Sequence, residues 1–514
     1  MRPDLEDRQR LALSLTRRLE VIATGRRDLA LQQENFDRQE KDVQQENFDR
    51  QEKAVQQEFK SLHNMNAAIS IFPSEVLSMV FEAGALLDSS PRCHFGSLVS
   101  YVSQRWRKIA LATPQLWNKI ECTRSKAEGE EYTTYITHLG EKVATFLSRS
   151  KSSPIDIRIQ DFYDEYQRDD KTRNFLTMLG DQVGHVNHLC IIDNNPDGVF
   201  DALKYLSHKP ASILHSVLLG THDDLFQLKR PLFPFGAPRL TIAQLNNIAT
   251  SSLHFCLPSF QHLQCLRLEG LVEIDRHEFR DALMTLPVLN HLELSVDRIF
   301  QNATSFSVVL PTVKFLQIET HGHDDLDRVI HTIHATSLTT LSLALWGYGG
   351  PGLNLSSEED LESHFPALQH LILEHIIQQA PDLEMVARMF PGIERLTCNW
   401  STSRENELFC DIDRILATID TGSSGDFLRW PKLHTVAVSA PGMPLDVGAL
   451  HHKISVMRDA GHPLRKLKLP KSLFVQTGAK AIGHLRQIVD VEDFSLDWPT
   501  PFAGLTIEVR LVDD

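Results

Sequence analysis

The 514-residue chain lacks the features of membrane proteins, secreted proteins and nucleic-acid binders. No stretch approaches the roughly 18 uninterrupted apolar residues of a membrane-spanning helix, and the opening MRPDLEDRQR is too polar and acidic for a signal peptide. The net charge is −15, and basic residues are outnumbered. Since binding of a phosphate backbone relies on basic surface, this balance argues against a nucleic-acid partner. We expect a soluble protein of the cytoplasm or nucleus, with no membrane partner.

Cysteine is scarce and carries no pairing pattern. The seven cysteines include no Cys-x-x-Cys pair, and their number is odd. Secreted disulfide scaffolds and zinc modules are therefore not indicated. We predict reduced and mostly buried thiols at Cys93, Cys122, Cys190, Cys256, Cys265, Cys398 and Cys410.

Catalytic signatures are also missing. The chain contains no Gly-x-Gly-x-x-Gly or Walker-type loop and no recognisable nucleophile signature around a serine or cysteine. One histidine cluster has spacing of the kind that metal sites use. Because 24 histidines are scattered along the chain, we interpret that cluster as a solvated turn that leads into a helix. We predict no enzymatic activity, no cofactor and no metal at His321, His323, Asp324, Asp325, His331 and His334.

Residues 1–66 form a charged segment without proline after Pro3. The unit QQENFDRQEKDV at 32–43 recurs as QQENFDRQEKAV at 44–55. Its richness in Gln, Glu, Arg and Lys predicts a helix. Apolar residues recur every seven positions, but the companion stripe of a coiled coil is absent. We favour a mostly solvated helix, and weak self-association through 15–62 is the alternative.

A second repeat runs from 186 towards the C-terminus. An apolar residue, two others, an apolar residue, one other and an apolar residue recur eleven times, as in Leu263–Leu266–Leu268 and Leu289–Leu292–Leu294. This is the L-x-x-L-x-L core of a leucine-rich repeat, and most periods are those of such repeats. The usual Asn three residues after the third apolar position is missing, as at Leu271 and Asp297. We therefore expect an irregular solenoid with a curved parallel sheet.

Residues 70–122 contain three apolar elements. Phe72, Pro73, Glu75 and Leu77 open a first helix, and the sequence VSQRWRKIA at 102–110 lies in a second. The sequence TPQLW at 113–117 forms a third short element. On the first helix the apolar residues spread over about 180°, whereas burying one seam needs an arc nearer 100°. About fifty residues with this much apolar surface cannot bury it all internally, so part must be covered by a partner or by the next domain.

The order Phe-Pro-x-Glu-Val-Leu, Trp-Arg-x-Ile-Ala and Pro-x-Leu-Trp resembles the F-box, and in particular the F-box proteins expanded in mushroom-forming fungi. Phe72 replaces the usual Leu, Ser103 stands where Cys is frequent, and the polar insertion 86–96 lengthens the first connection. The resemblance implies docking to a Skp-type adaptor and through it to a cullin. Trp106 and Trp117 are either contact residues or internal core. The implied positions in or directly behind the contact are Phe72, Pro73, Glu75, Leu77, Val80, Phe81, Trp106, Ile109 and Trp117.

The predicted fold class is therefore α/β, with four parts. They are a charged helix at 1–66, a three-helix F-box-like domain at 67–122, a connecting helix and linker at 123–153, and a leucine-rich-repeat-like solenoid at 154–514. The function that the resemblance implies is a substrate receptor of a cullin-RING ubiquitin ligase that holds an unidentified protein substrate. The alternative is a non-catalytic interaction scaffold with no role in ubiquitination.

Overall fold

In a computed structural model the chain divides into two units, residues 1–109 and 110–514. The structure describes residues 3–65, 68–87, 94–123, 132–162, 170–222, 224–271, 275–296, 307–320, 323–345, 361–374, 380–399, 412, 415–416, 419, 430–439, 446–459, 461–462, 464–472, 479–494 and 500–502.

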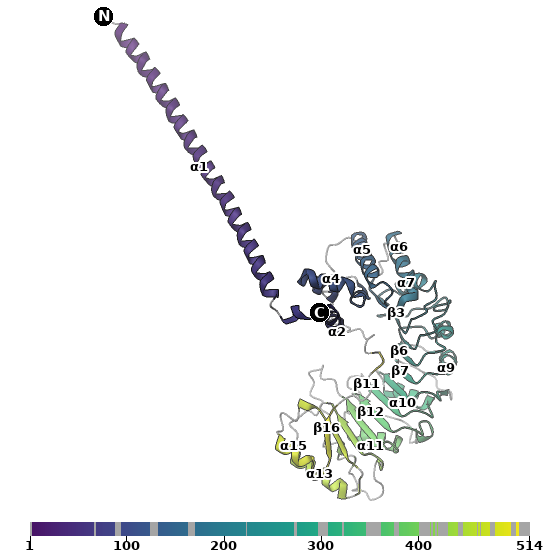
Figure 1. Ribbon diagram of the computed structural model, residues 1–514. Coiled ribbons are helices and arrows are strands. Elements are labelled where there is room, and N and C mark those ends of the chain that lie inside the picture. The colour runs from purple at the N-terminus through teal and green to yellow at the C-terminus, as the bar shows by residue number, and fades with distance from the viewer. Residues whose placement is uncertain are drawn as a thin grey trace. The chain divides into compact units, whose positions relative to one another are not determined.

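The N-terminal segment is one helix, α1 (Pro3–Met65), drawn in purple in Figure 1. This confirms the helix predicted for 1–66. Its described side chains are exposed, including the apolar residues Leu15, Ile22 and Leu29 of the seven-residue spacing. Side chains four positions apart contact one another, as where Gln45 Nε2 donates to Asp49 Oδ1 at 2.9 Å. Weak self-association through 15–62 stays a prediction.

The rest of the first unit is helical. A 3-10 turn, η1 (Ala68–Ile71), leads into α2 (Ser74–Leu87), and α3 (Phe95–Val102) and α4 (Gln104–Ala112) follow. The last residues of α4, from Ala110 on, belong to the second unit. The predicted single second helix is wrong, because Ser103 has extended backbone and separates α3 from α4. Its Oγ accepts a hydrogen bond from the Trp106 N–H at 3.1 Å, as an N-cap side chain does.

The second unit is built on a parallel sheet of fourteen described strands, which follow one another in chain order. Two further strands, β8 and β10, form a separate pair. Figure 1 shows this sheet as a curve with helices along its outer side. Its strands are β1 (Lys119–Thr123), β2 (Ile155–Gln160), β3 (Val186–Asp193), β4 (Ser216–Thr221), β5 (Ile242–Asn246), β6 (Cys265–Leu271), β7 (His291–Val296), β9 (Phe315–Thr320), β11 (Thr340–Leu345), β12 (His370–Glu374), β13 (Arg395–Asn399), β14 (Thr435–Val438), β15 (Lys466–Leu469) and β16 (Asp490–Asp493).

Short helices connect these strands. Among the described residues, no helix is long and apolar enough to cross a membrane. The helices and the two remaining strands are η2 (Pro114–Trp117), α5 (Tyr132–Ser150), α6 (Asp170–Gly180), η3 (Val183–His185), α7 (Pro196–Leu206), η4 (Thr250–Ser252), α8 (Leu253–Cys256), η5 (Leu257–Ser259), α9 (Arg276–Met284), β8 (Val308–Val309), α10 (His323–Thr332), β10 (Ile333–His334), η6 (Leu361–Ser363), α11 (Ala380–Met389), α13 (Val447–Asp459) and α15 (Ala479–Leu485).

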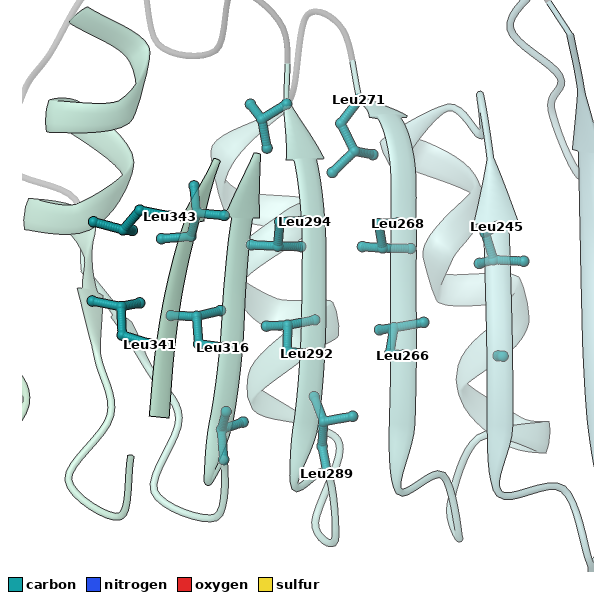
Figure 2. Close-up of a cluster of buried hydrophobic side chains, with 14 of the residues drawn as sticks. Leu245, Leu266, Leu268, Leu271, Leu289, Leu292, Leu294, Leu316, Leu341 and Leu343 are labelled. Atoms are coloured by element: carbon teal, nitrogen blue, oxygen red, sulfur yellow. The ribbon is translucent and has the colours of Figure 1, made fainter. Parts of the chain in front are cut away.

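The repeated leucines stack in register from strand to strand. Leu266 pairs with Leu292, and Leu292 with Leu316, so that equivalent positions of successive repeats form continuous rows. Figure 2 shows these rows pointing into one core beneath the sheet. Every apolar residue of the eleven predicted motifs is buried, and the second and third apolar residues of each motif lie on a strand from β3 to β15. The predicted leucine-rich-repeat-like α/β architecture with a curved parallel sheet is therefore confirmed.

The sheet begins earlier than the predicted solenoid start at 154. β1 pairs in parallel with β2, with Ile120 opposite Ile157, so the end of the predicted F-box-like domain supplies the first strand of the array. The predicted connecting helix also belongs to the array, because Ile136 and Val143 of α5 are buried in its core. The boundaries at 122 and 153 were wrong because β1, α5 and β2 bury their apolar residues together.

An asparagine at a different position closes one turn between repeats. Asn247, directly after β5, has a left-handed φ of 54°, and its Nδ2 donates to the carbonyl oxygens of Thr221 and His222 at 2.9 and 2.8 Å. Gly270 of β6 has a φ of +65°, and a Cβ there would lie 1.8 Å from Asn247 Oδ1. Two neighbouring repeats are thus closed by an asparagine two residues, rather than three, after the third apolar position.

Five of the seven cysteines lie in the described part of the chain, and all five are free thiols. Four are buried, and burial raises the pKa of Cys122 and of Cys256 to about 12. Such thiols stay protonated and unreactive at neutral pH. Cys93 and Cys410 lie outside the described residues.

Candidate functional site

Helix α2 has two apolar faces. Leu77 and Phe81 form the inner face and are fully buried. The Phe81 ring lies 4.8 Å from the ring of Trp106 on α4, centroid to centroid. Gly84 permits the close approach of α3, because a Cβ at this position would lie 2.4 Å from the Phe95 ring. These contacts hold α2, α3 and α4 together as one helical group.

The opposite face of α2 is apolar and exposed. Met79 is 68% exposed and Leu87 is 85% exposed, although both are large apolar side chains. At 100° per residue the exposed apolar positions of α2 fall within one arc, opposite Leu77 and Phe81. We call this set the α2 face: Val76, Met79, Val80, Leu86 and Leu87.

Neighbouring residues extend the exposed apolar surface of the first unit. Ile71 and Phe72 precede α2, and Leu98, Tyr101 and Val102 project from α3 at helical spacing. Soluble proteins rarely leave so many large apolar side chains of one small helical group in water unless a partner covers them.

The nine residues that the resemblance implied fall into three groups. Phe72, Pro73, Glu75 and Val80 are exposed at the start of α2 and on the α2 face. The Arg105 side chain fixes the backbone at Phe72, since its guanidinium donates to the Phe72 carbonyl oxygen. The second group lies directly behind the α2 face as core and comprises Leu77, Phe81, Ile109 and the half-buried Trp106.

Trp117, the ninth residue, belongs to the second unit. It is fully buried, its indole N–H donates to the Ala110 carbonyl oxygen at 2.8 Å, and its ring lies 5.3 Å from that of Phe146. The Arg149 guanidinium lies 4.3 Å from the same ring. Of the two alternatives for Trp117, the structure places it in the internal core.

Sequence reasoning missed the end of the α2 face. Leu86 and Leu87 were assigned to the polar insertion 86–96, but α2 continues through them. Met79 was also absent from the predicted contact residues. Their spacing was the available signal, because Val76, Met79, Val80 and Leu87 follow the i, i+3, i+4, i+11 pattern of one helix face.

A second candidate surface is the inner, concave side of the sheet, where the residues between the buried leucines lie. Arg267 on β6 pairs with Glu293 on β7 and, at 3.4 Å, with Glu269 on its own strand. His291 Nε2 lies 2.7 Å from Glu293 Oε1. Further along the sheet, Ser342 Oγ donates to Glu374 Oε1 at 3.2 Å.

The carboxylates of this surface respond differently to burial. Burial raises the pKa of Glu269 and Glu374. It raises the pKa of Glu319 to about 7, with further contributions from nearby carboxylates. For Glu293 burial is outweighed by the hydrogen bonds and charges of His291 and Arg267, which lower its pKa. The surface therefore holds one carboxyl group whose pKa is lowered beside three whose pKa is raised.

Metal chemistry has no support in the part of the chain that the structure describes, where no group of three or more His, Cys, Asp or Glu is placed to hold an ion. His331 and His334 each lie near His364, at ring distances of 6.3 and 3.8 Å. His321 of the predicted cluster lies outside the described residues.

Comparison with known proteins gives little further information. No family model and no curated protein matches the chain. Among solved structures it is similar to that titled "Crystal structure of TLR13-ssRNA13 complex", at 12% sequence identity and a TM-score of 0.28. The match covers 68% of this chain and 57% of that chain, so it spans little more than half of that protein's length. The repeat architecture stated above rests on the strand register alone.

Proposed function

We propose that the chain is an F-box-type substrate receptor of a cullin-RING ubiquitin ligase. The observation that supports this best is the α2 face, a row of large apolar side chains exposed on a helix whose other face is already packed. A helix laid against an apolar groove is a common mode of protein docking. The Phe-Pro-x-Glu start of this helix is also the part that resembles the F-box most closely.

The proposed docking surface has a charged border. Arg105, Arg107 and Lys108 are exposed on α4, and residues 94–112 contain no Asp or Glu. Apolar anchors supply most of the binding free energy of an interface, while border charges mainly set the association rate and orientation. An adaptor with an apolar groove and an acidic border would fit this arrangement.

Catalysis in such a complex is proximity alone. The repeat array would hold a protein substrate, and the adaptor would link it to the cullin and the charging enzyme, so that the local concentration of reactants rises without an active site in this chain. A leucine-rich-repeat-like array is suited to this because its long inner surface is built from side chains that vary without disturbing the buried leucines.

Co-expression of the full chain with a Skp-type adaptor tests the proposal. The intact chain should elute with the adaptor as a stoichiometric complex, and Met79→Glu should abolish that complex, because a carboxylate would be buried in an apolar contact. Met284→Glu is the matched control, since Met284 is 49% exposed at the end of α9 in the second unit.

No complex with the intact chain, or equal loss in both variants, would contradict the docking role. In the first of these cases the remaining candidate is a non-catalytic scaffold. The repeat architecture itself favours that candidate, because arrays of this kind bind proteins through their inner face.

A further inference from the structure

Residues 500–502 lie against the inner side of the sheet, far along the chain from the strands that they contact. Phe502 is fully buried. The guanidinium carbon of Arg267 lies 4.8 Å from the centre of its ring, and the His291 ring meets it edge-on at 5.8 Å. Thr500 Oγ1 lies 3.4 Å from Glu293 Oε1, across 207 residues of sequence.

Three adjacent strands, β6, β7 and β9, build the surface that receives this segment. Arg267 on β6 is the register partner of Glu293 on β7. His291 stacks on Phe315 of β9, with ring centres 4.2 Å apart and planes 13° from parallel. Each of these side chains is therefore held in place by a neighbour on the sheet, independently of Phe502. We call Arg267, His291, Glu293 and Phe315 the central seat.

The chemistry of the central seat selects an aromatic ring and a hydroxyl group. A desolvated guanidinium attracts the face of a ring, and the edge of an aromatic residue completes the enclosure. The ionised Glu293 accepts a hydrogen bond from the Thr500 hydroxyl. Thr500 Oγ1 in turn accepts from the Phe502 N–H at 3.3 Å, which folds the segment Thr-Pro-Phe into a compact turn around Pro501.

The Thr500 hydroxyl and the Phe502 ring both contact side chains of the seat. Residues 500–502 add no strand to the part of the sheet that the structure describes. Side chains of the seat thus recognise the segment much as they would recognise a separate peptide. An intramolecular peptide also has a high effective concentration, so it competes strongly with any peptide added from outside.

We propose that the central seat is a peptide-binding site for a partner segment of the form Ser/Thr-Pro-aromatic, and that Thr500–Phe502 of this chain occupies it as a competitor. The partner must displace Phe502 to bind. This holds whether or not the helical face of the first unit docks an adaptor, so the two proposals succeed or fail separately.

A binding measurement with the full chain tests the proposal. The probe is a fluorescent peptide with the sequence of residues 496–505, LDWPTPFAGL. Fluorescence anisotropy should show at least about tenfold tighter binding to Phe502→Ala than to the unmodified chain, because that substitution empties the seat for an external ring. The same peptide with Ala in place of its Phe should bind neither protein.

A second substitution locates the binding site. In the Phe502→Ala chain, Arg267→Ala should abolish peptide binding, because the guanidinium that faces the ring is gone. Arg280→Ala is the matched control, since Arg280 lies on α9 and pairs with the exposed Asp281 at the surface. It should leave peptide binding unchanged.

Two results would overturn the proposal. One is equal peptide affinity for the unmodified chain and Phe502→Ala, and the other is no peptide binding by folded Phe502→Ala. Thermal unfolding establishes that the variant is folded. If Phe502→Ala does not fold, Phe502→Leu takes its place, since it keeps an apolar side chain while removing the ring that Arg267 faces. The same two results then overturn the proposal.

Discussion

The indole N–H of Trp117 donates to the carbonyl oxygen of Ala110 at 2.8 Å. Ala110 is near the end of α4, where carbonyl groups lack partners within the helix. Trp117→Phe removes this donor and leaves space in the core beside Phe146. We expect a loss of about 1–3 kcal/mol in the free energy of unfolding of the second unit, measured by urea denaturation.

The same variant separates a core role from a contact role. Because Trp117 is fully buried, folded Trp117→Phe should bind a Skp-type adaptor as tightly as the intact chain. A large loss of adaptor affinity in the folded variant would mean that this residue acts in docking, contrary to its position.

The leucine rows should respond to truncation in proportion to burial. Leu292 on β7 is fully buried between equivalent leucines of the adjacent strands, whereas Val288 nearby is 44% exposed. Leu292→Ala should cost about 2–5 kcal/mol and Val288→Ala below about 1 kcal/mol in the free energy of unfolding, because only the first leaves a cavity. Equal losses in urea midpoint would show that the rows do not form one tightly packed core.

The repeat could be predicted from sequence because it depends on the spacing of a few buried side chains. Leu266, Leu292 and Leu316 lie where the L-x-x-L-x-L spacing puts them. The start of the array at β1 could not be predicted, because Ile120 and Ile157 become partners only through packing that joins distant segments. The role of Asn247 in closing a turn could not be predicted either, since its side chain donates to carbonyl groups of the preceding repeat.

The candidate site was predictable in outline for a similar reason. Helical periodicity gives the inner face of α2 at Leu77 and Phe81 and an apolar excess on the other side. The end of the helix was missed although Leu87 continues the same spacing, because Leu86 and Leu87 stand directly before the polar residues of the connection. The central seat left no local signal, because Arg267 and Phe502 meet only in the folded chain.

Glu319 should make the second unit less stable as pH rises. Its pKa is raised to about 7 by burial and by the charges of Glu269, Glu374 and Glu293, against the opposing charge of Arg267. The folded state therefore binds this proton more tightly than the unfolded chain, so stability falls as pH rises from about 4.5 to about 7 and stays lower above it.

Glu319→Gln removes the free-energy cost of ionising residue 319 in the folded state, since an amide does not ionise. We expect the variant to gain on the order of 1–3 kcal/mol over the intact chain at pH 8, and the difference to disappear near pH 5. Urea midpoints at the two pH values measure it. Glu278→Gln on the exposed side of α9 is the control and should give no such pH dependence. The same midpoint difference at both pH values would contradict the assignment to Glu319.

The two faces of α2 should separate folding from docking. Leu77→Ala removes a fully buried side chain and should destabilise the helical group by about 2–5 kcal/mol, whereas Val80→Ala, on the exposed α2 face, should cost less than about 0.5 kcal/mol. The rate of trypsin cleavage measures the loss of stability, because the peptide bonds after Arg105, Arg107 and Lys108 of α4 become cleavable when α4 unfolds locally. Cleavage there should be faster in Leu77→Ala and unchanged in Val80→Ala, while both variants bind the adaptor less well. Faster cleavage in both would mean that the α2 face stabilises the fold itself and is not free to dock a partner.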